Sequence, residues 1–321
     1  MFKKFNFTTL IIVFGVLLAL VVLMKVIQHS KGERNFTSKF FDVDTAKVST
    51  ILINPHGSRE EVRIVRNGKD WDLIKKNKTY RAEKKAVQPL LYELLNLKPD
   101  HLAAMDKSDW VQYQVTDTGS TRVRVEQTGK VIADFRLGKV SFQQYQQTSY
   151  VRTSNDDNVY AVNGFPAMSF NRSADDFRNK SMIQINNPAD IIRLVFTYPD
   201  SSFVMKKENN NWNINGEKVD SAKVAGYLST LSSLYGSEFV DDAVLPGNQI
   251  FSIKIEGKNF QPVELKAFSA DATNQYLVTS SLNSEGRFSG TKGELVKRTF
   301  VGPNHFKATA KEDSKTKGKK K

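Results

Sequence analysis

Polar and apolar residues alternate along two long stretches of the chain, and both stretches repeat the same order of features. The first runs from about Ser49 to Phe170 and the second from about Ile191 to Phe300. In each, short alternating runs come first, which are typical of half-buried antiparallel strands. One amphipathic helix and further alternating runs follow. This recurrence predicts a duplicated module; the competing interpretation is that unrelated β-rich domains share such patterns.

Each stretch contains a hairpin signal just before a tryptophan. In the first, the turn Asn67-Gly68 precedes Trp71, and both turn residues tolerate the positive φ that tight hairpins require. In the second, Asn209–Asn211 precedes Trp212. Tryptophans at equivalent places of a repeat each bury a large apolar area. We therefore expect both to be core anchors.

An apolar stripe with helical spacing follows each hairpin. Its residues recur at i, i+3, i+4 and i+7, which places them on one face of a helix. We expect Asp220 or Ser221 to cap the second helix, whereas Pro89 requires the first helix to start late or to bend. Four leucines match at one constant offset and are expected to be core anchors: Leu91, Leu94, Leu228 and Leu231. The full stripes are Val87, Leu90, Leu91, Leu94 and Leu95, and Val224, Tyr227, Leu228, Leu231 and Leu234.

The N-terminal segment is predicted to anchor the chain in a membrane. Phe5–Met24 contains no charged residue, and about 20 apolar residues are enough to cross a bilayer as a helix. A cleaved signal peptide is the competing interpretation, but it would have a shorter apolar core and small residues at its end, where Lys25–His29 stands. Lysines flank the segment on both sides, so the positive-inside rule leaves its orientation open.

The length of 321 residues allows about two ordinary domains. We predict an α+β fold in which an N-terminal transmembrane helix precedes two similar β-rich modules, each with antiparallel strands and one amphipathic helix. The anchor and its linker are placed at 1–33, the first module at 34–176 and the second at 177–306. Residues 307–321 form a lysine-rich tail that we expect to be disordered.

The net charge of +13 is concentrated at the ends of the chain. The tail alone has seven lysines against two acidic residues, so the body is only mildly basic. A lysine-rich tail can contact anionic lipid or nucleic acid. No aromatic residue interleaves with these lysines to stack on bases, and we expect no nucleic-acid partner.

Motifs for catalysis and metal binding are missing from the sequence. It has no phosphate loop, no HExxH and no GxSxG. It has no cysteine either, which excludes disulfides and thiol nucleophiles. Acidic pairs at 156–157, 175–176 and 241–242 lack the spacing of a calcium loop and are interpreted as solvated loop residues. We therefore expect no enzymatic activity, no cofactor and no metal.

Two features are candidates for contact with a ligand or partner. One is a run of amides around a tyrosine, which could line a polar groove for a sugar or peptide; the alternative is an exposed hairpin tip. The other is Trp110, which has no counterpart in the second copy; the alternative is packing against Tyr113. The run consists of Gln143, Gln144, Tyr145, Gln146 and Gln147.

Three groups of residues carry a family resemblance. They are the strand of Trp71 with Arg81-Ala82-Glu83 and the helix that follows; Phe135–Gly138 with Tyr150–Arg152 and Val159–Val162; and Phe177–Ile183 leading into Asp190-Ile191. Through them, the chain resembles the domain of unknown function 4340 family of bacterial envelope proteins over most of residues 48–280.

The resemblance implies a cellular setting that the residues themselves do not show. Members are usually single-pass proteins of the bacterial inner membrane with the body in the periplasm, encoded beside an ATP-binding-cassette (ABC) exporter linked to gliding motility. This implies a non-enzymatic accessory or scaffold subunit, with the permease and auxiliary membrane subunits as partners and membrane lipid around Phe5–Met24. The alternative is a stand-alone module that binds an envelope polymer, either glycan or lipid, through Gln143–Gln147.

Overall fold

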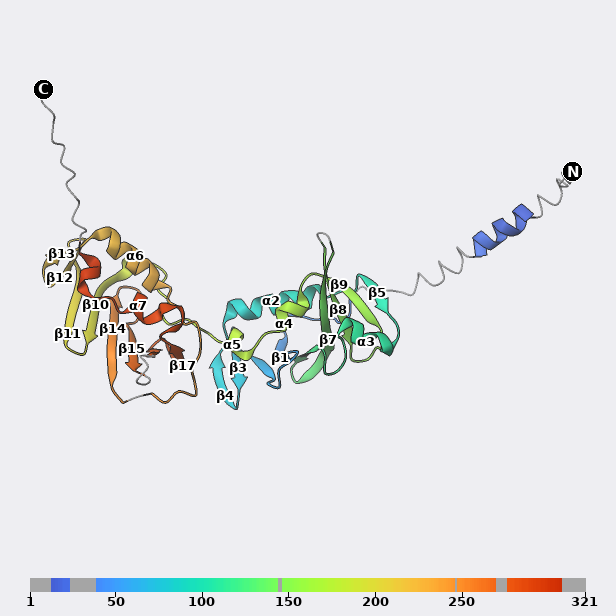
Figure 1. The fold of residues 1–321 in the computed structure, drawn as a ribbon, viewed down its shortest axis with the longest axis horizontal. Coiled ribbons are helices and arrows are strands. Elements are labelled where there is room, and N and C mark those ends of the chain that lie inside the picture. Colours follow the sequence, from blue (N-terminus) through green and yellow to red (C-terminus); the bar gives the residue numbers. More distant parts are fainter. Residues whose placement is uncertain (1–12, 24–38, 144–145, 246, 270–275, 308–321) are drawn as a thin grey trace, which may run out of the picture. The chain divides into compact units, whose positions relative to one another are not determined.

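Two antiparallel sheets make up most of the described chain (Figure 1). The structure is a computed structural model that describes residues 13–23, 39–143, 146–245, 247–269 and 276–307. Its contacts divide the chain into two units. The first consists of Met1–Lys76 and Lys85–Ala174, and the second of Asn77–Lys84 and Asp175–Lys321. The β-rich α+β class predicted from the sequence is confirmed.

The strands of the first unit run in the order β3-β2-β1-β6-β7-β8-β9-β5, and all neighbours are antiparallel. Their alternating burial leaves one face for the core and one for polar residues. The strands are β1 (Val48–Asn54), β2 (Val62–Asn67), β3 (Asp70–Lys75), β5 (His101–Ala104), β6 (Thr121–Gln127), β7 (Lys130–Gln143), β8 (Gln146–Thr153) and β9 (Val159–Asn163).

Helix α2 (Lys84–Asn96) contains Pro89 beyond its first turn, so one backbone hydrogen bond of the helix is absent. The helix buries Leu90 and Leu94, whereas Leu91 is half-buried and Leu95 is exposed. Each residue advances about 100° around a helix, and this carries Leu95 off the buried face. The other short helices of this unit are η1 (Lys107–Asp109), α3 (Trp110–Tyr113) and α4 (Pro166–Phe170), and α4 contacts β6, β7 and β8.

The second sheet has eight strands in the order β13-β12-β11-β10-β14-β15-β16-β17. Its helix α6 (Ser221–Ser232) begins after Asp220, whose carboxylate accepts hydrogen bonds from the backbone of Ala222 and Lys223. The strands are β10 (Ile191–Tyr198), β11 (Ser201–Glu208), β12 (Asn211–Ile214), β13 (Glu217–Lys218), β14 (Gln249–Gly257), β15 (Val263–Ser269), β16 (Tyr276–Ser280) and β17 (Asn283–Ser289).

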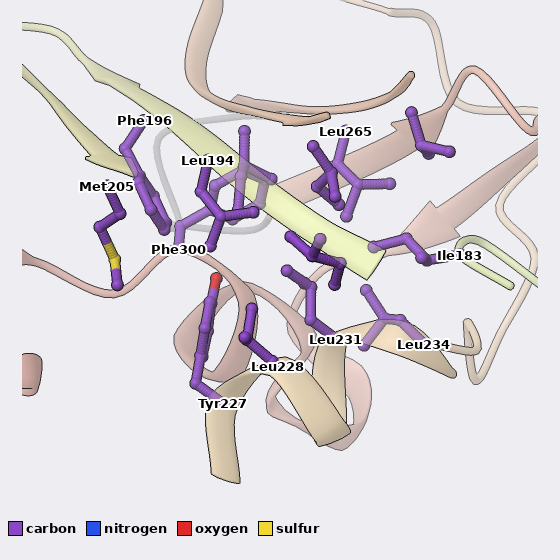
Figure 2. Close-up of a cluster of buried hydrophobic side chains, with 14 of the residues drawn as sticks. Ile183, Leu194, Phe196, Met205, Tyr227, Leu228, Leu231, Leu234, Leu265 and Phe300 are labelled. Atoms are coloured by element: carbon purple, nitrogen blue, oxygen red, sulfur yellow. The ribbon is translucent and has the colours of Figure 1, made fainter. Parts of the chain in front are cut away.

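The core of the second unit lies between α6 and its sheet. Figure 2 shows Leu228 and Leu231 of α6 directed toward Leu194 and Phe196 of β10. Tyr227 is also buried there, and its hydroxyl donates to the carbonyl oxygen of Thr299 at 2.6 Å. Burial raises the pKa of Tyr227 well above its ordinary value. The remaining helices of this unit are α5 (Ala174–Phe177), which begins at the boundary, η2 (Pro188–Asp190), η3 (Lys292–Glu294), α7 (Leu295–Thr299) and η4 (Pro303–Phe306).

The two sheets repeat one arrangement. The order β3-β2-β1-β6-β7-β8-β9 corresponds strand by strand to β12-β11-β10-β14-β15-β16-β17. Along the sequence, one long helix separates the first three strands of each series from the last four, α2 in the first unit and α6 in the second. Both series also shift register at the start of the first strand, at Val48/Thr50 and at Ile191/Arg193. This shared topology supports the internal repeat expected from the sequence.

The two tryptophans of the repeat differ in burial. Trp71 is buried, with the guanidinium of Arg66 4.2 Å from its ring centroid. Trp212 is only half-buried at the margin of the second core, because its strand lies next to the two-residue edge strand β13. The expectation of a full core anchor therefore holds for Trp71 and is too strong for Trp212.

The segment Asn77–Lys84 contains β4 (Lys78–Arg81) and packs with the second unit. The backbone N–H of Arg81 donates to the carboxylate of Glu285 at 3.0 Å, and the carbonyl oxygen of Arg81 accepts from the backbone of Asn179 at 2.9 Å. The N–H of Glu83 donates to the carbonyl oxygen of Phe177 at 2.7 Å. The second unit is thus built from two separate pieces of the chain.

At the N-terminus, residues 13–23 form a helix, and the rest of Phe5–Met24 lies outside the described residues. Within the described part of the chain, no helix is both long and apolar enough to span a membrane. Of the lysine-rich tail, Lys307 alone belongs to the described residues.

Candidate functional site

Three arginines form a row across adjacent strands of the first sheet. Arg122 of β6 lies opposite Arg136 of β7, which lies opposite Arg152 of β8. Directly opposed residues of antiparallel strands point to the same face, with Cβ atoms about 4.5–5.5 Å apart. The neighbouring positions Val123 and Phe135 are fully buried, so the arginines occupy the face away from the core. We call these three residues the arginine row.

The segment from Trp110 to Val115 covers part of this outer face. It passes so close to β7 that a Cβ on Gly138 would lie 2.0 Å from the carbonyl oxygen of Tyr113. Strand β7 also shifts register here, between Leu137 and Val140. Glycine is therefore required at 138 for the backbones to approach, which gives a physical role to one residue of the Phe135–Gly138 motif.

Arg152 is the most enclosed member of the row. Its Nε donates to the carbonyl oxygen of Val115 at 3.0 Å, and its Nη2 donates to Asp117 at 2.7 Å. The guanidinium lies 3.7 Å from the ring centroid of Trp110, a cation–π distance. The indole N–H of Trp110 donates to the carbonyl oxygen of Asp157 at 2.8 Å. Arg152 is thus clamped between its strand and the covering segment.

The placement of Trp110 differs from both sequence interpretations. It is half-buried and packs on Arg152, whereas Tyr113 packs on Tyr150 with ring centroids 4.6 Å apart. The path of the covering segment explains this, because it places the ring of Trp110 over Arg152 and the ring of Tyr113 over Tyr150, and both partners belong to β8.

Asp117 joins two members of the row. Its carboxylate accepts from Arg152 and lies 2.9 Å from Nε of Arg136. The hydrogen bond from Arg152 and the charges of Arg136 and Arg122 hold the pKa of Asp117 below its ordinary value. The Asp117 side chain is nevertheless 70 % exposed, so solvent reaches this carboxylate directly.

Arg136, at the centre of the row, is incompletely satisfied. Its side chain is 11 % exposed, and burial together with the charge of Arg152 lowers its pKa. The Nε atom is buried and has no well-directed hydrogen bond despite its proximity to Asp117. One Nη donates to Ser154 at a long 3.3 Å.

The other end of the row has a second carboxylate. Arg122 donates to both oxygens of Asp134, at 3.0 and 2.6 Å, and Nε of Arg124 lies 3.6 Å from the same group. Burial acts to raise the pKa of Asp134, but the hydrogen bond from Arg122 and the arginine charges outweigh it, and the pKa is lowered. Four arginines face Asp117 and Asp134, and Glu61 also acts on Arg122, so the positive charges outnumber the negative ones.

Chemically, this arrangement favours binding of an oxyanion. Planar guanidinium groups match carboxylate and phosphate groups through paired N–H donors. Among the described residues, no group of three or more His, Asp or Glu is placed to hold a metal ion.

The described residues of the run Gln143–Gln147 lie where β7 ends and β8 begins. Gln143 pairs with Gln146, and Gln144 and Tyr145 lie outside the described residues. The side chain of Gln146 is exposed and donates to Asn163 at 3.2 Å. Gln147 accepts the backbone N–H of Gly164 through its carbonyl oxygen. The described contacts do not join this run to Trp110.

A second enclosed arginine, Arg178, lies in the second unit. Its guanidinium is 3.9 Å from the ring centroid of Tyr80 and 3.5 Å from that of Phe239. It donates to both oxygens of Asp241 and to Asp175. The interpretation of the acidic pairs at 175–176 and 241–242 as solvated loops was therefore wrong for Asp175 and Asp241, because each compensates a buried cation.

The arginine row was not predicted from the sequence, although two of its members lie within the motifs Phe135–Gly138 and Tyr150–Arg152. The available signal was arginine at outward positions of alternating strands, as in Arg122 and Arg124. The direct opposition of the three residues depends on the pairing register, which no single strand displays.

Comparison with known proteins places this chain in a family. The model of the family described as Domain of unknown function (DUF4340) matches residues 71–248, which include the arginine row and Arg178. Neither the curated proteins nor the solved structures contain a match. Because the matched range covers more than half of its 321 residues, the chain belongs to the domain of unknown function 4340 family.

Proposed function

We propose that this protein is a non-enzymatic accessory subunit of an ABC-type export complex, anchored in the bacterial inner membrane with its body in the periplasm. The observation that carries the proposal is one apolar segment, Phe5–Met24, ahead of two sheets with the same strand order. A tethered body with a repeated sheet offers two related docking surfaces beside a membrane complex. The export complex itself is inferred from the family resemblance.

Docking through strand addition would use the edge strand β5. Unpaired strand edges accept a partner strand through backbone hydrogen bonds. The edge of β17 is already occupied, because Val240 donates to Arg287 and Ser289 donates to Glu238 through their backbones. On β5, Ala103 accepts a hydrogen bond from the hydroxyl of Tyr113 at 3.3 Å. Strand β5 is therefore the more open of these two edges.

Affinity capture of the full-length chain from its native membrane in mild detergent tests the proposal. We expect stoichiometric recovery of a permease and an ATP-binding subunit, identified by mass spectrometry. A chain that lacks Phe5–Met24 is the control, and it should lose or weaken both partners. Recovery of the chain alone in both forms would contradict the proposal.

A variant refines the docking test. Ala103→Pro removes a backbone N–H from β5 and should reduce recovery of the permease if strand addition is used. Ala103→Val keeps the N–H and serves as the matched control. Equal recovery with both variants would exclude strand addition at β5.

Binding of an envelope polymer is the second candidate, and the arginine row favours it over a purely structural role. Arg122, which is about one third exposed at one end of the row, can attract anionic groups of glycans and lipids. This candidate predicts that the isolated chain binds anionic polymer without any exporter subunit. Binding that is unchanged by substitutions in the arginine row would contradict it.

A further inference from the structure

We infer that the arginine row is a binding site for a phosphate group, and that Asp117 is the carboxylate that competes with this ligand. This site lies in the first sheet, and it would bind phosphate whether or not the chain joins an exporter.

The fold does not require the row. At the corresponding positions of the second sheet, Ser252 of β14 lies opposite Lys266 of β15, which lies opposite Thr279 of β16. Lys266 has its own carboxylate, Glu264, at 3.3 Å on the same strand. The same strand order therefore forms with one charged residue in this row instead of three.

The row has an energetic cost within the first sheet. Like charges directly opposite each other on antiparallel strands destabilise the pairing. The burial of Arg136 adds to this cost, because the group is desolvated without a well-directed bond from Nε. Burial and, after it, the charge of Arg152 lower the pKa of Arg136. An added anion beside the row would offset the repulsion among these arginines.

Access to the row is open on the side of Asp117. This carboxylate is 70 % exposed and already occupies the position of an oxyanion between Arg136 and Arg152. At the far end, the side chains of Arg122 and Arg124 are about one third exposed. A ligand can therefore approach from solvent and bind beside Asp117 or replace it.

The charge of the site selects the ligand class. The site keeps a net positive charge, and its planar guanidinium groups offer paired N–H donors. Both properties favour a phosphate group, which as a monoester carries about −1.5 to −2 at pH 7 and has three acceptor oxygens. A terminal phosphate group occurs in free inorganic phosphate, on sugars and on lipid headgroups such as that of phosphatidic acid, and the site would recognise the unesterified oxygens that these sources share.

The test uses the full chain in phosphatidylcholine nanodiscs and inorganic phosphate as the probe, measured by isothermal titration calorimetry. We expect saturable binding that weakens with salt. Arg136→Gln should weaken it about tenfold or more, because a charge-assisted hydrogen bond contributes about 1.5–3 kcal/mol. Lys266→Gln, at the matching position of the second sheet, should leave the affinity within about twofold.

A second variant keeps the inference testable if Arg136→Gln fails to fold. Asp117→Asn removes the carboxylate from the row and should strengthen phosphate binding, since Arg136 and Arg152 lose their competing partner. Weaker binding in Asp117→Asn would overturn the inference, and so would phosphate binding of equal strength in Arg136→Gln and the unmodified chain. An absence of saturable phosphate binding would overturn it as well.

Competition identifies the source of the phosphate. Displacement by phosphatidic acid in the nanodisc indicates a lipid headgroup, and displacement by glucose 6-phosphate indicates a phosphorylated sugar. Binding of inorganic phosphate that neither compound displaces would limit the inference to free phosphate. Recovery of exporter subunits with Arg136→Gln, measured in parallel, separates failure of this inference from failure of the proposed function.

Discussion

The two sheets share a strand order, but the enclosed arginine of each unit has different partners. In the first unit, Arg152 has one aromatic neighbour, Trp110, and one highly exposed carboxylate, Asp117. In the second unit, Arg178 lies between two rings and donates to two carboxylates. In both units some of these partners lie in the segment after the long helix: Trp110 and Asp117 between α2 and β6, and Phe239 and Asp241 between α6 and β14. The difference is in the partners: the carboxylates of Arg178 are at most 38 % exposed, whereas the carboxylate of Arg152 is 70 % exposed.

The largest expected effect lies at Arg178. Arg178→Met should lower the free energy of unfolding of the second unit by about 3 kcal/mol, because the substitution leaves Asp241 without its buried cation. Hydrogen exchange measured by mass spectrometry should show the loss in β10–β17. Protection that stays unchanged there would contradict a stabilising role for Arg178.

The next effect concerns Arg152, whose carboxylate partner is exposed. Arg152→Met should cost about 2 kcal/mol, since Val115 and the Trp110 ring lose their contacts while Asp117 remains solvated. The matched control Thr279→Met changes a half-buried outer position of the second sheet and should stay within about 0.5 kcal/mol. Chemical denaturation of each variant measures both. If both variants lowered the free energy of unfolding equally, the contacts of Arg152 would contribute no more to stability than those of Thr279.

A smaller effect is expected when part of the row is built into the second sheet. Thr279→Arg places a cation directly opposite Lys266 and should destabilise that sheet by about 0.2–1 kcal/mol. Added salt should restore part of the loss, because it screens exposed charges. Thr279→Gln controls for side-chain length, and a loss that salt does not change would point to packing instead of repulsion.

The smallest effect is a dependence on pH. The pKa of Asp134 is lower in the folded chain, so its contribution is present above the unfolded pKa of about 3.9 and is lost as pH falls through the folded pKa. Asp134→Asn should remove this component from β6–β8, an effect below about 1 kcal/mol. Acid titration followed by hydrogen exchange measures it. Glu256, whose pKa is lowered by Lys254 and Arg193, supplies a reference in the second sheet; an unchanged acid response of β6–β8 would refute the prediction.

Local chemistry allowed much of the fold to be predicted. Asp220 caps α6 because its carboxylate reaches two free N–H groups, and the turn before Trp212 uses positive φ at Asn209 and Asn210. Both features depend on neighbours in sequence. The strands and the two long helices could also be predicted, because the alternation of polar and apolar residues and the helical spacing of apolar residues are visible among neighbours in the sequence.

Features that depend on pairing between distant segments were not predictable. The arginine row exists only after β6, β7 and β8 adopt one register, and Arg178 meets Phe239 only after the chain has folded back over 61 residues. The need for glycine at 138 likewise follows from the crossing of Tyr113 over β7. Such contacts join residues whose separation in the sequence carries no periodic signal.

The segment Asn77–Lys84 also has a consequence for dissecting the protein into fragments. Because this segment packs with the second unit, the polypeptide passes between the units at three points, 76/77, 84/85 and 174/175. A fragment that starts at residue 175 lacks Tyr80, one of the two rings against Arg178. A single proteolytic cut after residue 174 should leave both pieces associated through 77–84, so their separation requires denaturation as well as cleavage.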